Sequence, residues 1–115
     1  MKKKKPETIA FAIDRNGEVI GSVGLHHIKG HKTEMGYWLS EKHWGQGIMT
    51  EAVRAVTRFA FNKLKIKRLF AKTFPFNKAS MKVLRKAGYK FEGILRKDVK
   101  KGNRFLDTHL FAKVK

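Results

Sequence analysis

The sequence contains no cysteine, two prolines and only nine acidic residues among 115. Without cysteine the chain forms no disulfide, offers no thiolate to zinc and has no cysteine nucleophile. No apolar run approaches the roughly 20 residues of a membrane-spanning helix, and the N-terminal lysines are not followed by the apolar segment of a signal peptide. We therefore expect a soluble, cytoplasmic protein that makes no contact with a membrane.

Positive charge dominates what is present. There are 27 lysine and arginine residues, and the formal net charge is +18. Such a surface attracts polyanions, including nucleic acid, acidic proteins and phosphorylated cofactors. A lysine-rich surface that serves only solvation is an equal alternative, and no RNA-binding signature sequence is present. The length predicts one domain, over 8–115, after a basic tail over 1–7.

Local patterns predict eight segments of secondary structure. Asn16 and Gly17 between alternating apolar residues favour a hairpin turn, because both tolerate positive φ. Asn77 is a typical N-cap of a helix, and Gly88 is a typical residue just after its end. The expected segments are a hairpin over 8–28, a strand over 33–40, a helix over 48–63, a strand over 67–73, a helix over 78–87, and strands over 89–97 and 104–113 joined by a turn at 101–103.

The order β-β-β-α-β-α-β-β is typical of an α+β or mixed α/β fold with a central sheet. The third strand, the first helix and the fourth strand form a crossover connection. The third and fourth strands are therefore expected to lie parallel.

A glycine-bearing loop, Gly45-Gln46-Gly47, connects the third strand to the first helix. The first N–H groups of a helix have no partner within it, and they lie at the positive end of its dipole. Glycine permits the unusual φ angles and close backbone approach that a phosphate-binding loop needs. The sequence therefore predicts a phosphate site here, with an ordinary glycine turn as the alternative.

Four blocks in order give a family resemblance: EMGYWL at 34–39, WGQGIMTEA at 44–52, NKAS at 77–80 and KAGYKFEG at 86–93. Together they resemble the GNAT acetyltransferases, of the RimJ/RimL type that acetylates protein N-terminal amines and related substrates. The resemblance implies a mixed, mostly antiparallel sheet with a splayed parallel pair and two main helices. It also implies direct attack of a primary amine, for example a protein N-terminus, on acetyl-CoA.

In the family, backbone amides of the loop bind the CoA diphosphate, and the loop reads Arg or Gln, two residues, Gly, one residue, then Gly or Ala. Gly47 matches the central glycine here, whereas Trp44 and Met49 depart from the first and last positions. The resemblance also implies that pantetheine pairs with the third strand. The cofactor-binding residues expected from it are Trp38, Leu39, Ser40, Trp44, Gly45, Gln46, Gly47, Ile48, Met49, Thr50, Asn77, Ser80 and Lys86.

Amine acetylation needs a group that takes a proton from the amine and a group that stabilises the leaving thiolate. The resemblance assigns the first role to Glu34, with a surface or salt-bridged glutamate as the alternative. Many GNAT enzymes use a tyrosine for the second role, but Leu84 occupies that position here. The RimJ/RimL type instead has a serine three residues after an asparagine, and Ser80 matches it in the block Asn77-Lys78-Ala79-Ser80. The alternative is that Ser80 has a structural role at the start of the helix, where its side chain forms a hydrogen bond with nearby backbone.

Further expectations concern metals, the acceptor site and partners. His26 and His27 are adjacent on a predicted strand, so they would point to opposite faces, and no HExxH motif is present; we expect no metal. The family usually has an additional N-terminal strand and two helices that wall the acceptor site. Either this chain is a minimal form, or another subunit of a homodimer supplies that wall.

Two functions therefore stay open. The first is an N-acetyltransferase, with Lys42, Lys82 and Lys86 either assisting the CoA phosphates or simply solvated. The second is a catalytically weak basic module with the same fold that contacts RNA or the ribosome through its positive surface.

Overall fold

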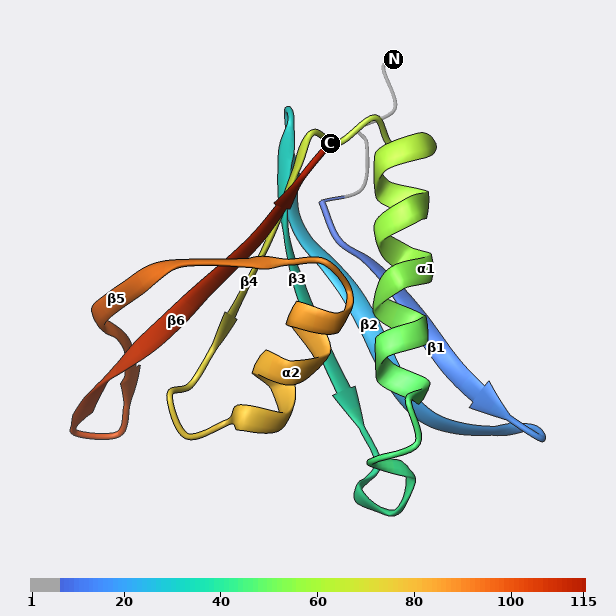
Figure 1. The fold of residues 1–115 in the computed structure, drawn as a ribbon, viewed down its shortest axis with the longest axis horizontal. Coiled ribbons are helices and arrows are strands. Elements are labelled where there is room, and N and C mark those ends of the chain that lie inside the picture. Colours follow the sequence, from blue (N-terminus) through green and yellow to red (C-terminus); the bar gives the residue numbers. More distant parts are fainter. Residues whose placement is uncertain (1–6) are drawn as a thin grey trace.

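A computed structural model describes residues 7–115 of the chain (Figure 1). The predicted basic tail, 1–7, lies outside the described residues apart from Glu7. Six strands form one sheet in the order β1-β2-β3-β4-β6-β5. The elements along the chain are β1 (Ile9–Arg15), β2 (Glu18–Lys29), β3 (Lys32–Leu39), a short 3-10 helix η1 (Glu41–His43), α1 (Ile48–Asn62), β4 (Arg68–Thr73), α2 (Lys78–Lys86), β5 (Lys90–Lys101) and β6 (Arg104–Val114).

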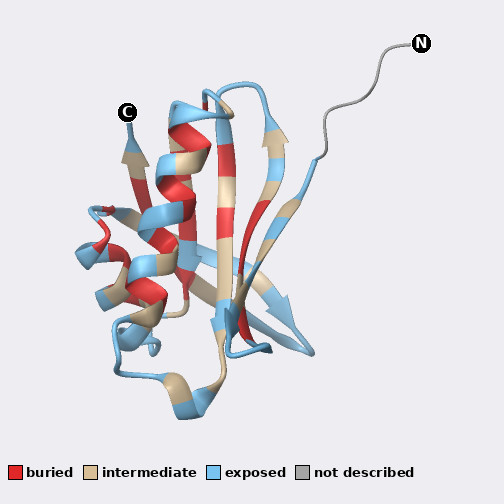
Figure 2. Ribbon diagram, turned by 90° about the vertical axis from the view of Figure 1, so that its right-hand side faces the viewer, coloured by how far each residue is buried: buried red, intermediate tan, exposed pale blue. Residues whose placement is uncertain are grey.

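Both long helices cover the same face of the sheet, as Figures 1 and 2 show from two directions. The core lies between this face and the helices. It includes Val23 and Leu25 of β2, Val53 of α1 and Phe111 of β6, each fully buried. No described helix covers the opposite face, where Ala10 and Ala12 and other side chains face outward. The sheet therefore has one packed face and one open face.

The parallel pair of strands is splayed, as predicted. β3 and β4 pair only from Lys32 opposite Arg68 to Glu34 opposite Phe70. Beyond Glu34, β3 continues to Leu39 and β4 continues to Thr73 without pairing to each other. The crossover helix α1 starts beside the wide end of this splay, so the fold places a helix N-terminus near an opening between two strands.

Several local predictions are confirmed by backbone geometry. Asn16 and Gly17 have positive φ in the β1–β2 turn, and Gly88 has positive φ after α2. The Asn77 side chain caps α2 by accepting the Ser80 N–H at 3.1 Å. These positions were predictable because each signal depends on a few adjacent residues.

The predicted end of β5 at Lys97 is wrong, because the strand runs to Lys101. Lys97 adopts a φ of 49° in a bulge, and its N–H donates to the Asp107 carboxylate at 2.8 Å. Strand pairing resumes at Val99. A side chain from the opposite strand thus satisfies the backbone at a point where the sequence suggested that the strand stopped.

The predicted alternation at His26 and His27 also needs correction. His27 has a φ of 54°, and the β2–β3 register shifts between His26 and Lys29. The buried Thr33 hydroxyl donates to the His26 carbonyl at 2.7 Å and so satisfies the backbone at this bulge. Strict alternation of side chains therefore does not hold here. Among the described residues, no helix is long and apolar enough to cross a membrane.

Candidate functional site

A cleft of about 590 Å³ opens where β3 and β4 diverge. Its walls come from the end of β3, the loop before α1, the first turn of α1, and α2. The lining residues are Tyr37, Trp38, Leu39, His43, Trp44, Gly45, Gly47, Ile48, Met49, Thr50, Asn77, Ala79, Ser80, Lys82, Val83 and Lys86. All but two of the predicted cofactor-binding residues thus meet in one place; Ser40 and Gln46 do not line it.

The loop before α1 presents free backbone donors to this cleft. Gly45 and Gly47 both have a φ of 76°, which only glycine adopts without strain. The first hydrogen bond of α1 runs from the Glu51 N–H to the Gly47 carbonyl at 3.1 Å. Across this fully described loop, no N–H group from 45 to 50 donates to another group of the protein. These donors lie at the positive end of α1 and are suited to an anion.

The Met49 side chain packs in the core and is 6% exposed. The larger residue at the position where the family has glycine or alanine is thus accommodated by the core. Gln46 is held from outside the cleft, because its side chain accepts a hydrogen bond from Arg15 at 3.0 Å. This contact fastens the loop to the β1–β2 hairpin.

The Trp44 indole connects the loop to the end of β3. Its Nε1 donates to the Leu39 carbonyl at 2.7 Å, although the side chain is 58% exposed. The Ser40 N–H donates to the Ile20 carbonyl at 2.7 Å. Two backbone groups of the predicted pantetheine-pairing segment are therefore already bonded within the protein, and the segment free of a β4 partner is Met35–Leu39.

Two hydroxyl groups meet at the floor of the cleft. The Tyr37 Oη atom lies 2.6 Å from Ser80 Oγ and 3.2 Å from the Ser80 carbonyl oxygen. Burial raises the pKa of Tyr37, and the hydrogen bond with Ser80 partly opposes this shift. Tyr37 is therefore a neutral hydrogen-bond donor at physiological pH.

No sequence pattern indicated a polar role for Tyr37. Its side chain does pack against the core, but its hydroxyl reaches α2. Leu84, at the position where many GNAT enzymes have a tyrosine, is fully buried. The hydroxyl beside Ser80 thus comes from β3 and not from α2, and this depends on how α2 packs on the sheet.

His43 is a second cleft residue that sequence reasoning missed. Its Nε2 atom is buried and, among the described residues, has no hydrogen-bond partner. A buried nitrogen without a partner costs free energy unless a ligand or water satisfies it. Because His43 lines the cleft, a ligand bound there is one candidate partner for this nitrogen.

Glu34 lies elsewhere. Met35 and Tyr37 of β3 pack on the helix side, so Glu34 faces the open side of the sheet by alternation. It does not line the cleft, whereas Ser80 does. The structure therefore does not bring the two predicted catalytic residues together. Glu34 lies on the open face at the last β3–β4 pair, whereas Ser80 lies near the start of α2 on the helix side of the sheet.

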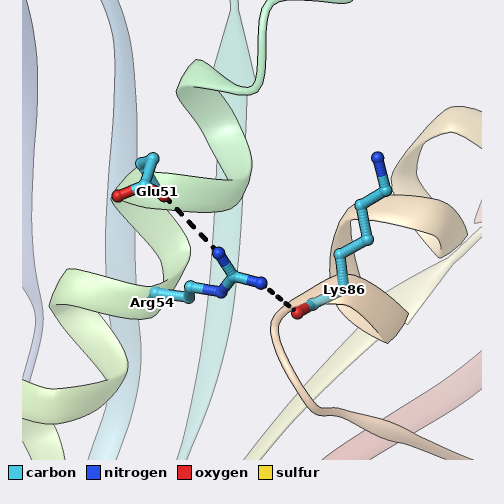
Figure 3. A network of polar contacts seen from close by, with 3 residues as sticks. All are labelled: Glu51, Arg54 and Lys86. Atoms are coloured by element: carbon cyan, nitrogen blue, oxygen red, sulfur yellow. Dashed lines mark hydrogen bonds and ion pairs between the residues drawn. The ribbon is translucent and has the colours of Figure 1, made fainter.

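The two helices that flank the cleft are joined by Arg54 (Figure 3). Its guanidinium donates to the Lys86 carbonyl at 2.8 Å and forms an ion pair with Glu51 at 3.4 Å. The Lys86 side chain extends away from this contact in Figure 3. Lys82 and Lys86 both line the cleft, whereas Lys42 forms a 3.8 Å ion pair with Glu18.

Comparisons with known proteins agree with this architecture. A profile of the acetyltransferase (GNAT) domain matches residues 1–90. A probable N-acetyltransferase of Bacillus subtilis (strain 168), YjcK, is 44% identical over 114 residues, which cover 95% of this chain and 63% of that protein. A ribosomal-protein-S5-alanine acetyltransferase from Vibrio fischeri has a TM-score of 0.89 at 29% identity, over 94% of this chain and 62% of that one. Mycobacterium smegmatis RimJ in complex with CoA-disulfide has a TM-score of 0.89 at 25% identity, over 94% of this chain and 53% of that one. The chain thus spans between about half and two thirds of the length of each of these proteins.

Proposed function

Because the chain belongs to the GNAT acetyltransferase family, we propose that it transfers the acetyl group of acetyl-CoA to a primary amine by direct attack. The observation that carries this proposal is the row of free N–H groups from 45 to 50 beside a cleft between α2 and the end of β3 that has no β4 partner. Such a row binds a diphosphate through several hydrogen bonds and a helix dipole at once. A solvated basic surface does not require this arrangement.

The remaining parts of the cleft suit the rest of the co-substrate. Lys82 and Lys86 supply positive charge beside the phosphates. The segment Met35–Leu39, which pairs with β2 but not with β4, offers a strand edge along which the amides of pantetheine extend toward the point where β3 and β4 meet. His43 Nε2 offers one more polar contact to the co-substrate in this cleft.

In the transfer itself, the amine nitrogen forms a bond to the acetyl carbon while the carbon–sulfur bond breaks. The Ser80 hydroxyl donates a hydrogen bond to the departing thiolate, and Tyr37 orients that hydroxyl. A hydroxyl is a weak acid, so its role is stabilisation of the sulfur charge. Glu34, on the open face, assists removal of the amine proton.

The acceptor is proposed to be a primary amine such as a protein N-terminus. This rests on the similarity to a ribosomal-protein acetyltransferase and to RimJ. An acetyl-CoA consumption assay against N-terminal peptides, lysine peptides, polyamines and small amines identifies the class. Activity on none of these amines, despite CoA binding, would contradict the assignment of an amine acceptor.

Calorimetry with CoA tests the central observation. Gly47→Glu places a carboxylate at the loop and forces a side chain into a φ of 76°, so it should abolish binding. Gly30→Glu is the matched control, because Gly30 also has positive φ and open space around it, in the β2–β3 turn. Absence of CoA binding by the unmutated protein would sink the proposal.

A basic binding module is the second candidate function. Two exposed aromatic side chains favour it, Phe76 at 73% and Phe105 at 56% exposure. Phe105 lies near Lys100, and Phe76 stacks on Phe74, which lies near Lys101. Aromatic faces beside positive charge suit single-stranded RNA. This function predicts RNA affinity that falls steeply with salt, in the absence of acetyl transfer.

A further inference from the structure

The imidazole of His26 lies against two glycines. Gly24 and Gly36 are directly opposite each other in the β2–β3 ladder. A Cβ atom on Gly24 would stand 2.8 Å from His26 Nε2, and one on Gly36 would stand 3.3 Å from the same atom. A side chain at either position would therefore crowd the ring. The glycine pair provides the space in which the imidazole rests on the backbone.

Glu34 of β3 lies directly across from His26. It is also the last β3 residue that pairs with β4, where it stands opposite Phe70. Met35 is buried beneath the helices, so Glu34 and Gly36 belong to the open face by alternation. His26 and Glu34 thus lie together at the base of the splay, on the face that the helices leave uncovered.

This position matters for the second substrate. On the helix side, α1 and α2 line the cleft and would screen a thioester held in it. The open face provides the remaining direction from which an amine can reach the acetyl carbon. We infer that His26 is the general base of the transfer, taking the proton of the acceptor ammonium on this face, and that Glu34 supports it from across the strand. The inference rests on the proposed function and adds to it the group that prepares the amine.

Imidazole is chemically suited to this step. N-terminal and lysine amines have ordinary pKa values of about 8 and about 10.4, so both are mainly ammonium ions at pH 7. Histidine is the side chain whose charge ordinarily changes between about pH 5 and 8, so it is a base at neutral pH and releases its proton easily afterwards. A carboxylate is a much weaker base, and its charge serves better to stabilise the imidazolium that forms.

The protons and bonds balance as follows. Neutral His26 accepts one proton from the ammonium, and the freed amine forms the nitrogen–carbon bond. The carbon–sulfur bond breaks, and the second amine proton goes to the thiolate, whose charge Ser80 has stabilised. His26 then loses its proton to solvent. The products are the amide, CoA thiol and one released proton.

Other charges on this face influence the pH dependence of the step. Lys32 lies two residues before Glu34 on β3, and Arg68 lies on β4 with its charge paired to a carboxylate of β5. The adjoining position of β1, Thr8, is uncharged. Glu34 is thus the acidic group directly opposite His26.

The test compares three variants. His26→Gln fills the same space without a titrating group, and we expect kcat/KM to fall about 100-fold while CoA affinity stays unchanged. Gly24→Ala keeps the histidine but displaces its ring, because the new Cβ atom would contact the far end of that side chain. We expect a smaller fall in kcat/KM for this variant than for His26→Gln. His27→Gln, at the exposed neighbouring residue, is the matched control and should keep wild-type activity.

A second measurement separates a base from a structural residue. Each variant is assayed with two amines of different basicity, the α-amine of an unblocked peptide and the ε-amine of Nα-acetyl-lysine. Loss of a base should slow the more basic amine more, and raising the pH should restore activity in His26→Gln. Wild-type rates in that variant, or equal losses on both amines with no recovery at high pH, would overturn the inference. If the unmutated protein binds no CoA, both this inference and the proposed function are contradicted. If it binds CoA normally, the variants test the role of His26 alone.

Discussion

The hydroxyl groups of Tyr37 and Ser80 lie 2.6 Å apart at the floor of the cleft, although 43 residues separate them in the chain. Each residue comes from a different wall: Tyr37 from β3 and Ser80 from the first turn of α2. Burial raises the pKa of Tyr37, so its hydroxyl keeps its proton and can donate it to Ser80 Oγ. In the proposed transfer, this donation leaves the Ser80 proton free to point toward the sulfur of the co-substrate.

We expect Tyr37→Phe to lower kcat about 10-fold, because loss of one orienting hydrogen bond costs about 1–1.5 kcal/mol. The KM for acetyl-CoA should change little. In a Ser80→Ala background the same substitution should have no further effect, since the tyrosine acts through the serine. Steady-state kinetics of the two single variants and the double variant measure this.

Tyr89→Phe is the control for the tyrosine. Tyr89 is also buried, and its hydroxyl lies 2.7 Å from Thr57 Oγ1; neither of these two residues lines the cleft. Burial raises the pKa of Tyr89 to about 12. Its substitution should lower stability and leave kcat unchanged. Independent, additive losses from Tyr37→Phe and Ser80→Ala would contradict a shared role.

His43→Leu should separate stability from binding. The Nε2 atom of His43 is buried without a partner among the described residues, which destabilises the free protein. We expect the leucine variant to be as stable as the wild type, or more stable by about 1 kcal/mol, and to bind CoA several-fold more weakly. Thermal unfolding and calorimetry test the two effects, with the exposed His31→Leu as control. Unchanged CoA affinity would remove His43 from the site.

The ion pair of Arg68 with Glu92 should add a small, pH-dependent contribution to stability. The two side chains form a bidentate contact at 2.6 and 3.0 Å, and the hydrogen bond from Arg68 lowers the pKa of Glu92. A lowered carboxyl pKa stabilises the fold above the ordinary value of about 4.3, and the effect disappears as the pH falls through the folded value. Because Glu92 is well exposed, Glu92→Gln should cost less than about 1 kcal/mol at pH 7.

Chemical denaturation at pH 7 and at pH 3 measures this difference. The difference between the variant and the wild type should shrink as the pH is lowered from 7 toward 3, because the carboxyl of Glu92 takes up a proton as the pH falls through its lowered pKa. Glu51→Gln is the control, because the Glu51 carboxylate forms only a long, exposed ion pair with Arg54. A difference that is larger at pH 3 than at pH 7 would show that the bridge is not its source.

The features that were predictable from the sequence depend on short stretches of chain. The hairpin turn at Asn16 and Gly17, the cap at Asn77 and the glycine loop before α1 each follow from the conformational preferences of a few neighbouring residues. The parallel pair followed from the order of elements and the crossover rule. The free N–H groups before α1, proposed here to bind phosphate, were predictable for the same reason, since they belong to one contiguous loop.

The features that were missed depend on tertiary packing. The contact between Tyr37 and Ser80 requires α2 to lie across β3, and no local pattern specifies that angle. The bulge at Lys97 is stabilised by Asp107 of the opposite strand, so the strand continued where its own sequence suggested an end. The sequence analysis considered His26 only as a metal ligand. The packing of its ring against Gly24 and Gly36 depends on the β2–β3 register, which the local sequence does not specify.

The last prediction concerns the basic surface around Phe74 and Phe76. Their rings stack at 5.3 Å with an interplanar angle of 6°, and Lys101 Nζ lies 5.4 Å from the Phe74 ring. If the chain contacts RNA, a flat exposed ring beside a cation is where an unpaired base would stack, at about 1–3 kcal/mol per base. Phe76→Ala should therefore weaken binding of a single-stranded oligonucleotide at least 5-fold at low salt and leave duplex binding unchanged. Fluorescence anisotropy over a salt series measures both.

Lys63→Ala, at the end of α1, is the control. It should reduce only the salt-dependent part of the RNA affinity. RNA affinity that does not change with salt, or that is the same in Phe76→Ala and the wild type, would contradict RNA binding at this surface.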